Sequence, residues 1–139
     1  QTIRGRLEGL QAYHSYTRDD KAKESVEGLR PVLNIDQLSK LSDVVHPVVR
    51  THEDTGARSL FVNPGFTFAI KDMEPDDSAN LLKELFEHST KPELIYTHEW
   101  QPHDLLCWDN RSVMHQATNY DTTYVRHMHR TTIEGGKPF

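Results

Sequence analysis

Short β-type segments separated by turn residues dominate the chain from His46 onward, and they restrict its fold more than any other feature. The segments HPVVRTH, RSLFVN and PGFTFAIKDM come first, and the turn EDTGA between the first two predicts a β-hairpin. Four more strands are predicted at ELIYTHEW, DLLCWDN, SVMHQAT and TYVRHMHRTTI. Several short strands with few helices predict a mainly β fold, a β-sandwich or jelly-roll with helical decoration.

A long helical pattern occurs over residues 74–90. Pro75 and Asp76 stand at its start, as is typical of a helix N-terminus. The predicted buried stripe consists of Ala79, Leu82, Leu85 and Phe86, with Leu81 beside it. Shorter helices are predicted over residues 1–14 and 34–45.

The segment between these two short helices, residues 15–31, is polar and charged. Such a stretch is typical of a solvated surface loop or of a lid over a site, and the sequence leaves both readings open. We therefore expect residues 15–45 to form a lid or variable loop region. The total length of 139 residues predicts a single domain.

The composition excludes several classes of protein. With 16 basic and 21 acidic residues the net charge is -5, so neither nucleic acid nor a membrane surface is an expected partner. No apolar run is long enough to cross a bilayer. One cysteine, Cys107, cannot form an internal disulfide, which favours a cytoplasmic location. The hydrophobic content of 35% is low for a whole domain, and predicts partial disorder or a piece of a larger protein.

Titratable side chains gather in the last two predicted strands. Arg126 and Arg130 share one strand face, roughly 13 Å apart at about 3.3 Å per residue. They are ordinary surface arginines if that face meets solvent, and they need anionic partners if it faces a barrel interior. His115 shares its face with Val113 and Ala117, where a lone histidine is more often a core residue than a metal ligand.

Three stretches resemble the C-terminal half of the taurine dioxygenase (TauD/TfdA) family: HPVVRTHEDTGARSLFVNPGF, KPELIYTHEWQPHDLLCWDNRSVMHQAT and RHMHRTTIEGGKPF. The family consists of Fe(II)- and 2-oxoglutarate-dependent dioxygenases on a double-stranded β-helix, or jelly-roll. The resemblance implies that residues 1–139 are the C-terminal part of one such domain. It also implies an incomplete jelly-roll, because the N-terminal strands are absent from this sequence.

The resemblance also implies roles for individual residues. The family's iron is bound by two histidines and one carboxylate, and His115 matches the last of these ligands. Arg126 matches the arginine that pairs with the distal carboxylate of 2-oxoglutarate. Arg130 matches the arginine that binds the anionic head of the substrate in sulfonate-using members. Phe66 matches an aromatic residue of the substrate pocket, and Trp108 a tryptophan packed near the iron.

The H-x-D/E motif that supplies the other two iron ligands is not found at the matching place. The string His52-Glu53-Asp54 falls in the predicted hairpin turn, so we interpret it as a coincidence rather than a site. His98-Glu99 and His103-Asp104 have the wrong spacing. The sequence therefore carries one of the three expected iron ligands and both anion-binding arginines.

The function implied by the resemblance is hydroxylation of a small anionic substrate of the taurine, alkyl sulfonate or sulfate ester type. Fe(II) is the implied cofactor, and O2 and 2-oxoglutarate are consumed to give succinate and CO2. Family members commonly form dimers or tetramers, so a homo-oligomer is expected. Two alternatives stay open: a non-catalytic fragment or remnant that keeps the fold without the H-x-D ligands, and an anion-binding β-sandwich unrelated to oxygen chemistry.

Overall fold

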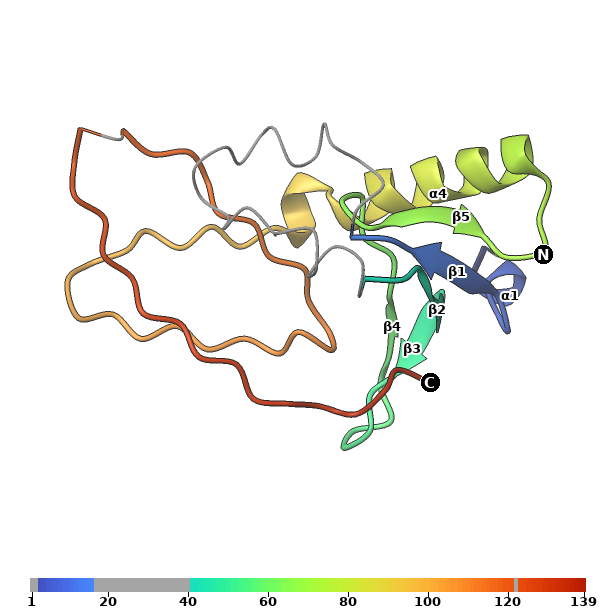
Figure 1. Ribbon diagram of the computed structural model, residues 1–139, viewed down its shortest axis with the longest axis horizontal. Coiled ribbons are helices and arrows are strands. Elements are labelled where there is room, and N and C mark those ends of the chain that lie inside the picture. Colours follow the sequence, from blue (N-terminus) through green and yellow to red (C-terminus); the bar gives the residue numbers. More distant parts are fainter. Residues whose placement is uncertain (1–2, 17–40, 122) are drawn as a thin grey trace.

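The computed structural model describes residues 3–16, 41–121 and 123–139 (Figure 1). Antiparallel strands and one long helix make up most of the ordered elements. In chain order these are α1 (Ile3–Arg6), β1 (Gln11–His14), β2 (Val44–Pro47), β3 (Val49–Thr51), β4 (Arg58–Leu60), β5 (Thr67–Ile70), α4 (Pro75–Ser89) and the 3-10 helix η1 (Pro92–Leu94).

Two antiparallel sheets organise the fold, one with the order β2-β1-β5 and one formed by β3 and β4. The second is the hairpin that the EDTGA turn predicts, and that prediction is confirmed. HPVVRTH was expected as one strand, but it divides at Val48 between the two sheets. The N–H of Val48 donates to the carbonyl of Leu10 at 2.9 Å, and its carbonyl accepts from Phe61 at 2.8 Å. Val48 is fully buried, so it joins the two sheets through the core.

The helix predicted over residues 1–14 is wrong for most of its length. Only Ile3–Arg6 is helical, and Gln11–His14 is the central strand of the three-stranded sheet. Gly9 has a φ of 75°, a left-handed conformation that ends the helical turn at little cost. Strand neighbours on both sides then supply the hydrogen bonds of Gln11–His14, and this pairing overrides a weak local helical pattern.

The loop or lid region expected over residues 15–45 lies mostly outside the described residues. This holds for the whole of 17–40, which contains most of the predicted lid and the start of the helix predicted over 34–45. The end of that helix is not helical, because β2 begins at Val44.

The long helix α4 is confirmed and lies along β5 (Figure 1). Its buried side chains are Ser78, Leu81, Leu82 and Leu85. The prediction of a buried Ala79 is wrong, because the stripe begins one residue earlier and Ala79 is exposed. Phe86 is only partly buried. The buried leucines of α4 pack with side chains from the rest of the fold in one apolar core cluster: Leu7, Ala12, Val48, Val62, Ile70, Leu81, Leu82 and Leu85.

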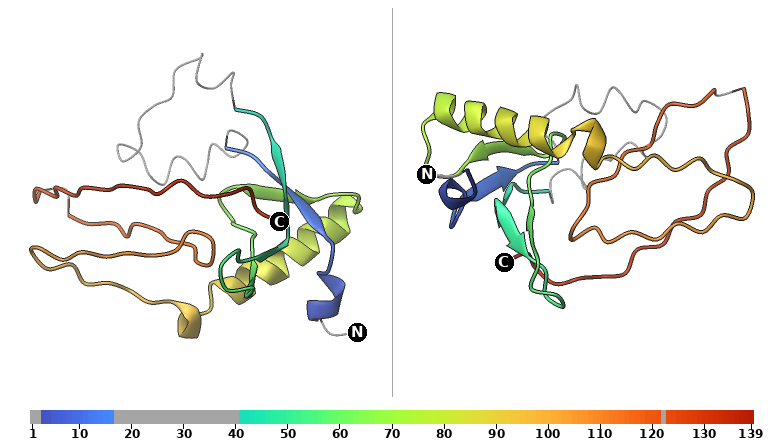
Figure 2. Two further views of the ribbon diagram at one scale, coloured as in Figure 1. Left: turned by 90° about the horizontal axis from the view of Figure 1, so that it is seen from below. Right: turned by 180° about the vertical axis from the view of Figure 1, so that it is seen from behind.

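Residues 95–121 and 123–139 contain no strand, so the four strands predicted there are not formed in this structure. The chain runs through this part as extended loops that reach away from the sheets and α4 (Figures 1 and 2). A β-strand takes its hydrogen bonds from a neighbouring strand, and alternating side chains alone do not supply them. The C-terminal end returns to the hairpin, where the N–H of Thr51 donates to the carbonyl of Phe139 at 2.9 Å.

None of the helices in the described ranges has the length and apolar character that a bilayer crossing requires.

Candidate functional site

A tight turn brings Trp108 and His115 together. The carbonyl of Asp109 accepts hydrogen bonds from the N–H groups of Ser112 at 3.0 Å and Val113 at 3.1 Å. The chain therefore reverses between the two aromatic side chains. Their ring centroids lie 4.9 Å apart, with the planes tilted by 48°.

Arg130 joins this pair from a distant part of the sequence. Its guanidinium carbon lies 5.9 Å from the centroid of the Trp108 ring, a cation–π distance. Partial burial, and then the charge of Arg130, lower the pKa of His115. Neighbouring groups cover His115 only in part and much of its surface stays exposed, so it is not a buried core histidine. The structure thus brings together Trp108, His115 and Arg130, three of the residues that the sequence singles out.

Two further predicted site residues are held by other aromatic rings. The guanidinium carbon of Arg126 lies 5.4 Å from the centroid of the Tyr120 ring. Phe66 stacks on Tyr16, with centroids 5.8 Å apart and planes within 18°. Neither contact belongs to the group formed by Trp108, His115 and Arg130. The site that the sequence predicts is therefore only partly assembled in this structure.

The string His52-Glu53-Asp54 has a structural role that the sequence does not reveal. The Nδ1 atom of His52 accepts hydrogen bonds from the N–H groups of Asp54 at 3.2 Å and Thr55 at 3.3 Å. An imidazole that accepts at Nδ1 carries its proton at Nε2, which here donates to the Oδ2 atom of Asp109 at 2.9 Å. Both ring nitrogens are therefore engaged, and His52 has no free nitrogen for a metal. This supports its interpretation as a coincidental match to the H-x-D motif.

Arg111 completes this contact between the hairpin and the turn. Its guanidinium binds Asp109 through Nε at 3.0 Å to Oδ1 and Nη2 at 2.9 Å to Oδ2. Its Nη1 reaches Asp54 at 2.8 Å and Glu53 at 3.2 Å. The hydrogen bond from Arg111, and then the one from His52, hold the pKa of Asp109 well below its usual range. Sequence reasoning missed this network, because its two halves lie more than 50 residues apart.

Comparison with known proteins defines the family. The model of the family described as taurine catabolism dioxygenase TauD, TfdA matches residues 1–132. The chain belongs to this family. The match includes His115, Arg126 and Arg130, the residues to which the sequence resemblance assigns roles.

Individual TauD/TfdA relatives agree with this assignment. An (S)-phenoxypropionate/alpha-ketoglutarate-dioxygenase of Sphingobium herbicidovorans is 33% identical over 136 residues, which cover 97% of this chain and 47% of the relative. A putative alpha-ketoglutarate-dependent sulfonate dioxygenase of Schizosaccharomyces pombe is 37% identical over 95 residues, or 68% of this chain and 24% of the relative. The chain spans at most about half the length of these relatives.

Solved TauD/TfdA structures share the fold. A crystal structure of AAD-2 in complex with Mn(II) and N-oxalylglycine matches with a TM-score of 0.69 and 30% identity, over 88% of this chain and 46% of that one. A taurine dioxygenase from Burkholderia xenovorans matches with a TM-score of 0.53 and 29% identity, over 71% of this chain and 28% of that one. These matches confirm the predicted fold class, a mainly β jelly-roll of which this chain covers a part.

The sequence resemblance assigns one iron ligand of a TauD/TfdA dioxygenase, His115, to this chain. Within the described ranges, no group of three or more histidine, cysteine, aspartate or glutamate side chains could hold a metal ion. His115 does fit as a single ligand, because its lowered pKa favours the neutral imidazole that metals bind. The role of His115 as one member of a facial triad stays a prediction.

Two histidines, His14 of β1 and His46 of β2, lie side by side in the three-stranded sheet. The ring centroids of His14 and His46 are 5.2 Å apart. The Nδ1 atom of His14 is 3.1 Å from the Thr67 hydroxyl, while its Nε2 and the Nδ1 of His46 are buried without a partner among the described residues. Burial, and then the neighbouring His46, lower the pKa of His14 to about 4. Sequence reasoning did not single out this pair.

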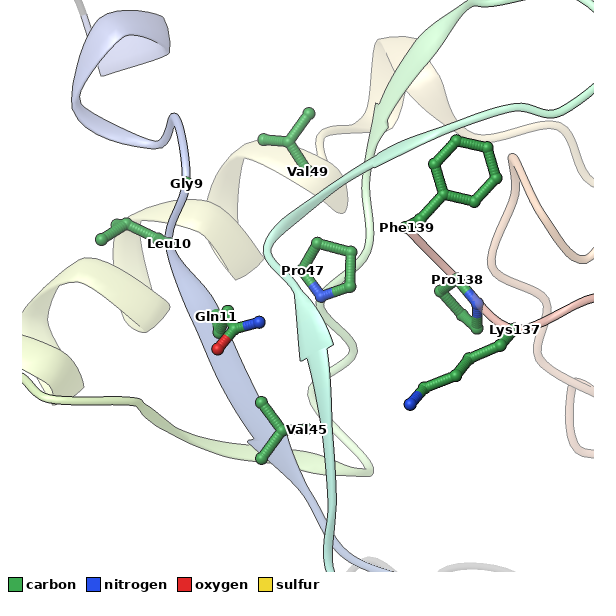
Figure 3. Close-up of a pocket in the computed structure, with 9 residues that line it drawn as sticks. All are labelled: Gly9, Leu10, Gln11, Val45, Pro47, Val49, Lys137, Pro138 and Phe139. Carbon is green, nitrogen blue, oxygen red and sulfur yellow. The ribbon is translucent and has the colours of Figure 1, made fainter.

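A groove of about 470 Å³ lies between β1, β2 and the C-terminal end (Figure 3). Its walls are about equally polar and apolar, and Lys137 supplies its charged side chain. None of His115, Arg126, Arg130 and Phe66 lines it. The groove is therefore separate from the predicted site.

Proposed function

We propose that this protein is an Fe(II)- and 2-oxoglutarate-dependent dioxygenase that hydroxylates a small anionic organic compound. In this proposal residues 1–139 are the C-terminal part of a single catalytic domain. The contact of His115, Trp108 and Arg130 is the observation that carries the proposal, because it joins a metal-type ligand to an anion-binding cation. The names of relatives include a phenoxypropionate and a sulfonate dioxygenase, which supports a carboxylate or sulfonate substrate.

His115 is the proposed iron ligand of this chain. A neutral imidazole binds iron through a ring nitrogen, and the nearby Arg130 favours that form by opposing a second positive charge. The Trp108 ring contacts the imidazole, with the two ring centroids 4.9 Å apart. When bound, the iron would activate O2, which is the oxidant: one oxygen atom would convert 2-oxoglutarate to succinate and CO2, and the other would hydroxylate the substrate.

The two arginines are proposed to position the anions. A guanidinium can form two parallel hydrogen bonds to a carboxylate or sulfonate, which fixes orientation as well as position. Arg126 is assigned to the distal carboxylate of 2-oxoglutarate and Arg130 to the substrate anion. Because Arg130 lies over Trp108, an anion bound there would be held close to His115. Phe66 is assigned to the apolar wall of the substrate pocket.

Removal of single side chains from the complete protein tests these roles. Addition of 2-oxoglutarate to the anaerobic Fe(II) protein should produce a weak visible charge-transfer band, and His115→Ala should abolish it. Arg126→Ala should raise the dissociation constant of 2-oxoglutarate by about 100-fold, as expected for loss of a charged hydrogen-bonded pair.

Arg4→Ala is the matched control, because Arg4 is an exposed arginine of α1. This variant should leave the band and the affinity unchanged. Unchanged 2-oxoglutarate binding in Arg126→Ala would contradict the assignment, and would favour an anion-binding protein unrelated to oxygen chemistry.

A non-catalytic remnant is the second candidate, favoured because the described residues contain no group of three or more histidine, cysteine, aspartate or glutamate side chains that could hold a metal ion. The two candidates differ in one measurement on the complete protein. An enzyme forms the band and releases succinate in the presence of O2. A remnant shows neither, although its fold is intact by circular dichroism.

A further inference from the structure

His52 is nearly buried, and Asp109 connects it to Trp108 of the proposed site. It is 8% exposed, and its Nε2 donates to Asp109, which directly precedes the turn that places Trp108 against His115. A buried imidazole with both nitrogens engaged is held in one orientation. It therefore offers a fixed point to which the Asp109 carboxylate is attached.

Asp109 is the residue on which the turn depends. Its carbonyl accepts from Ser112 and Val113, and its Oδ1 accepts from the N–H of Arg111 at 2.8 Å. Its other oxygen, Oδ2, accepts from His52 at 2.9 Å. The same residue thus closes the turn and attaches it to the β3–β4 hairpin, and Trp108 is its direct neighbour in the chain.

We propose that His52 is a positioning residue: through Asp109 it fixes the turn that holds Trp108 against His115. This inference rests on the proposed function, because it assigns His52 to the geometry of the proposed iron ligand. His52 does not touch a reacting atom in this proposal. Loss of its Nε2 hydrogen bond should loosen the turn and misplace Trp108 and His115, whereas the fold of the hairpin is kept.

Two substitutions at His52 separate its two hydrogen-bonding roles. In His52→Asn the side-chain oxygen can still accept from the N–H groups of Asp54 and Thr55, as asparagine does in turns, but the side chain is too short to reach Asp109. In His52→Gln the amide N–H can reach Asp109 and restore the link. A purely structural need for the imidazole predicts that both variants behave alike.

The first readout uses the metal-free protein and does not depend on activity. In a Trp100→Phe background, Trp108 is the remaining tryptophan of this sequence. If the complete protein has further tryptophans, their fluorescence is measured in a Trp108→Phe variant and subtracted. His52→Asn should raise the acrylamide quenching constant of Trp108 about twofold, because a loosened turn exposes the ring. His52→Gln should return it to the wild-type value.

The second readout is anaerobic Fe(II) affinity of the complete protein. His52→Asn should raise the Fe(II) dissociation constant by about 10-fold, as for loss of an outer partner of a metal ligand. His52→Gln should restore most of it. Asp54→Asn is the control, because it removes only the ion pair of an exposed carboxylate with Arg111 and keeps Asp109 intact.

Wild-type quenching and wild-type Fe(II) affinity in His52→Asn would overturn the inference, and so would equal defects in the Asn and Gln variants. If His52→Asn does not fold, Asp109→Asn replaces it, since an amide has one acceptor oxygen and cannot accept from both the His52 imidazole and Arg111 as the carboxylate does. It should then give the same rise in quenching. A wild-type protein that binds no Fe(II) but shows the quenching pattern supports the positioning of Trp108 and overturns the proposed function.

Discussion

At the scale of single residues, His14 shows how burial sets a charge state. Its imidazole lies between β2 and β5, close to His46, and its Nε2 has no partner among the described residues. Desolvation, and then repulsion from His46, lower its pKa from 6.5 to about 4. The neutral form is therefore the native form at neutral pH.

This shift predicts that acid destabilises the protein well above the pKa of its carboxylates. The unfolded chain takes up a proton at His14 near pH 6.5, whereas the folded chain does so only near pH 4. Between these values the unfolded state binds more protons, so the free energy of unfolding falls as the pH falls. The loss should be on the order of 1–2 kcal/mol after allowance for partial solvent exposure.

Urea unfolding of the wild type and of His14→Phe between pH 4 and pH 7.5 measures this effect. The variant should have a flatter dependence of the urea midpoint on pH, with the remaining slope due to His46 and other groups. Identical slopes for the two proteins would show that His14 does not carry the effect.

At the scale of elements, Ser78 connects α4 to β5. Its hydroxyl oxygen accepts a hydrogen bond from the N–H of Ile70 at 2.7 Å, and it is 3% exposed. Ile70 is the last residue of β5, so this bond joins the end of the strand to the first turns of the helix. A serine in the apolar stripe of a helix is thereby explained.

Ser78→Ala should lower the free energy of unfolding by about 1–3 kcal/mol, because it leaves the buried N–H of Ile70 without an acceptor. Asn80→Ala on the exposed side of α4 is the control and should change it by less than about 0.5 kcal/mol. Thermal and urea unfolding give both values. A Ser78→Ala variant as stable as the control would mean that the N–H finds another partner.

At the scale of the whole molecule, apolar side chains are divided unevenly. The core cluster joins the sheets to α4, whereas several large apolar residues of the C-terminal third are strongly exposed. Leu105, Val125 and Ile133 are 95%, 97% and 94% exposed. We therefore expect the part that contains the sheets and α4 to unfold as the cooperative unit of this 139-residue chain.

This division predicts two classes of amide hydrogen exchange in the 139-residue chain. The amides of Val125, Met128 and Ile133 should exchange at nearly unprotected rates, because no backbone hydrogen bond holds them within the described residues. Amides in the middle of α4 and in β1 should exchange much more slowly. Equal protection of the two groups, measured by NMR or mass spectrometry, would contradict this division.

Prediction from sequence succeeded where the signal was local. The hairpin around EDTGA and the helix α4 follow from turn residues and from helical spacing, and both are confirmed. The strand at Gln11–His14 was missed, because its hydrogen bonds come from partners distant in sequence. Of the candidate site, the structure shows the contact of Trp108 with His115. The roles of His115, Arg126, Arg130 and Phe66 stay predictions.

The sequence by itself determined the family and the jelly-roll class, and it named the residues whose roles are proposed, because motif spacing and side-chain type are properties of the chain alone. Only the tertiary structure decided the use of His52 and Asp109. Their hydrogen bond spans 57 positions, and a contact of that kind depends on how the hairpin and the turn pack together. The tertiary structure likewise decided that alternating segments after η1 stay unpaired, because a strand forms only where another strand meets it.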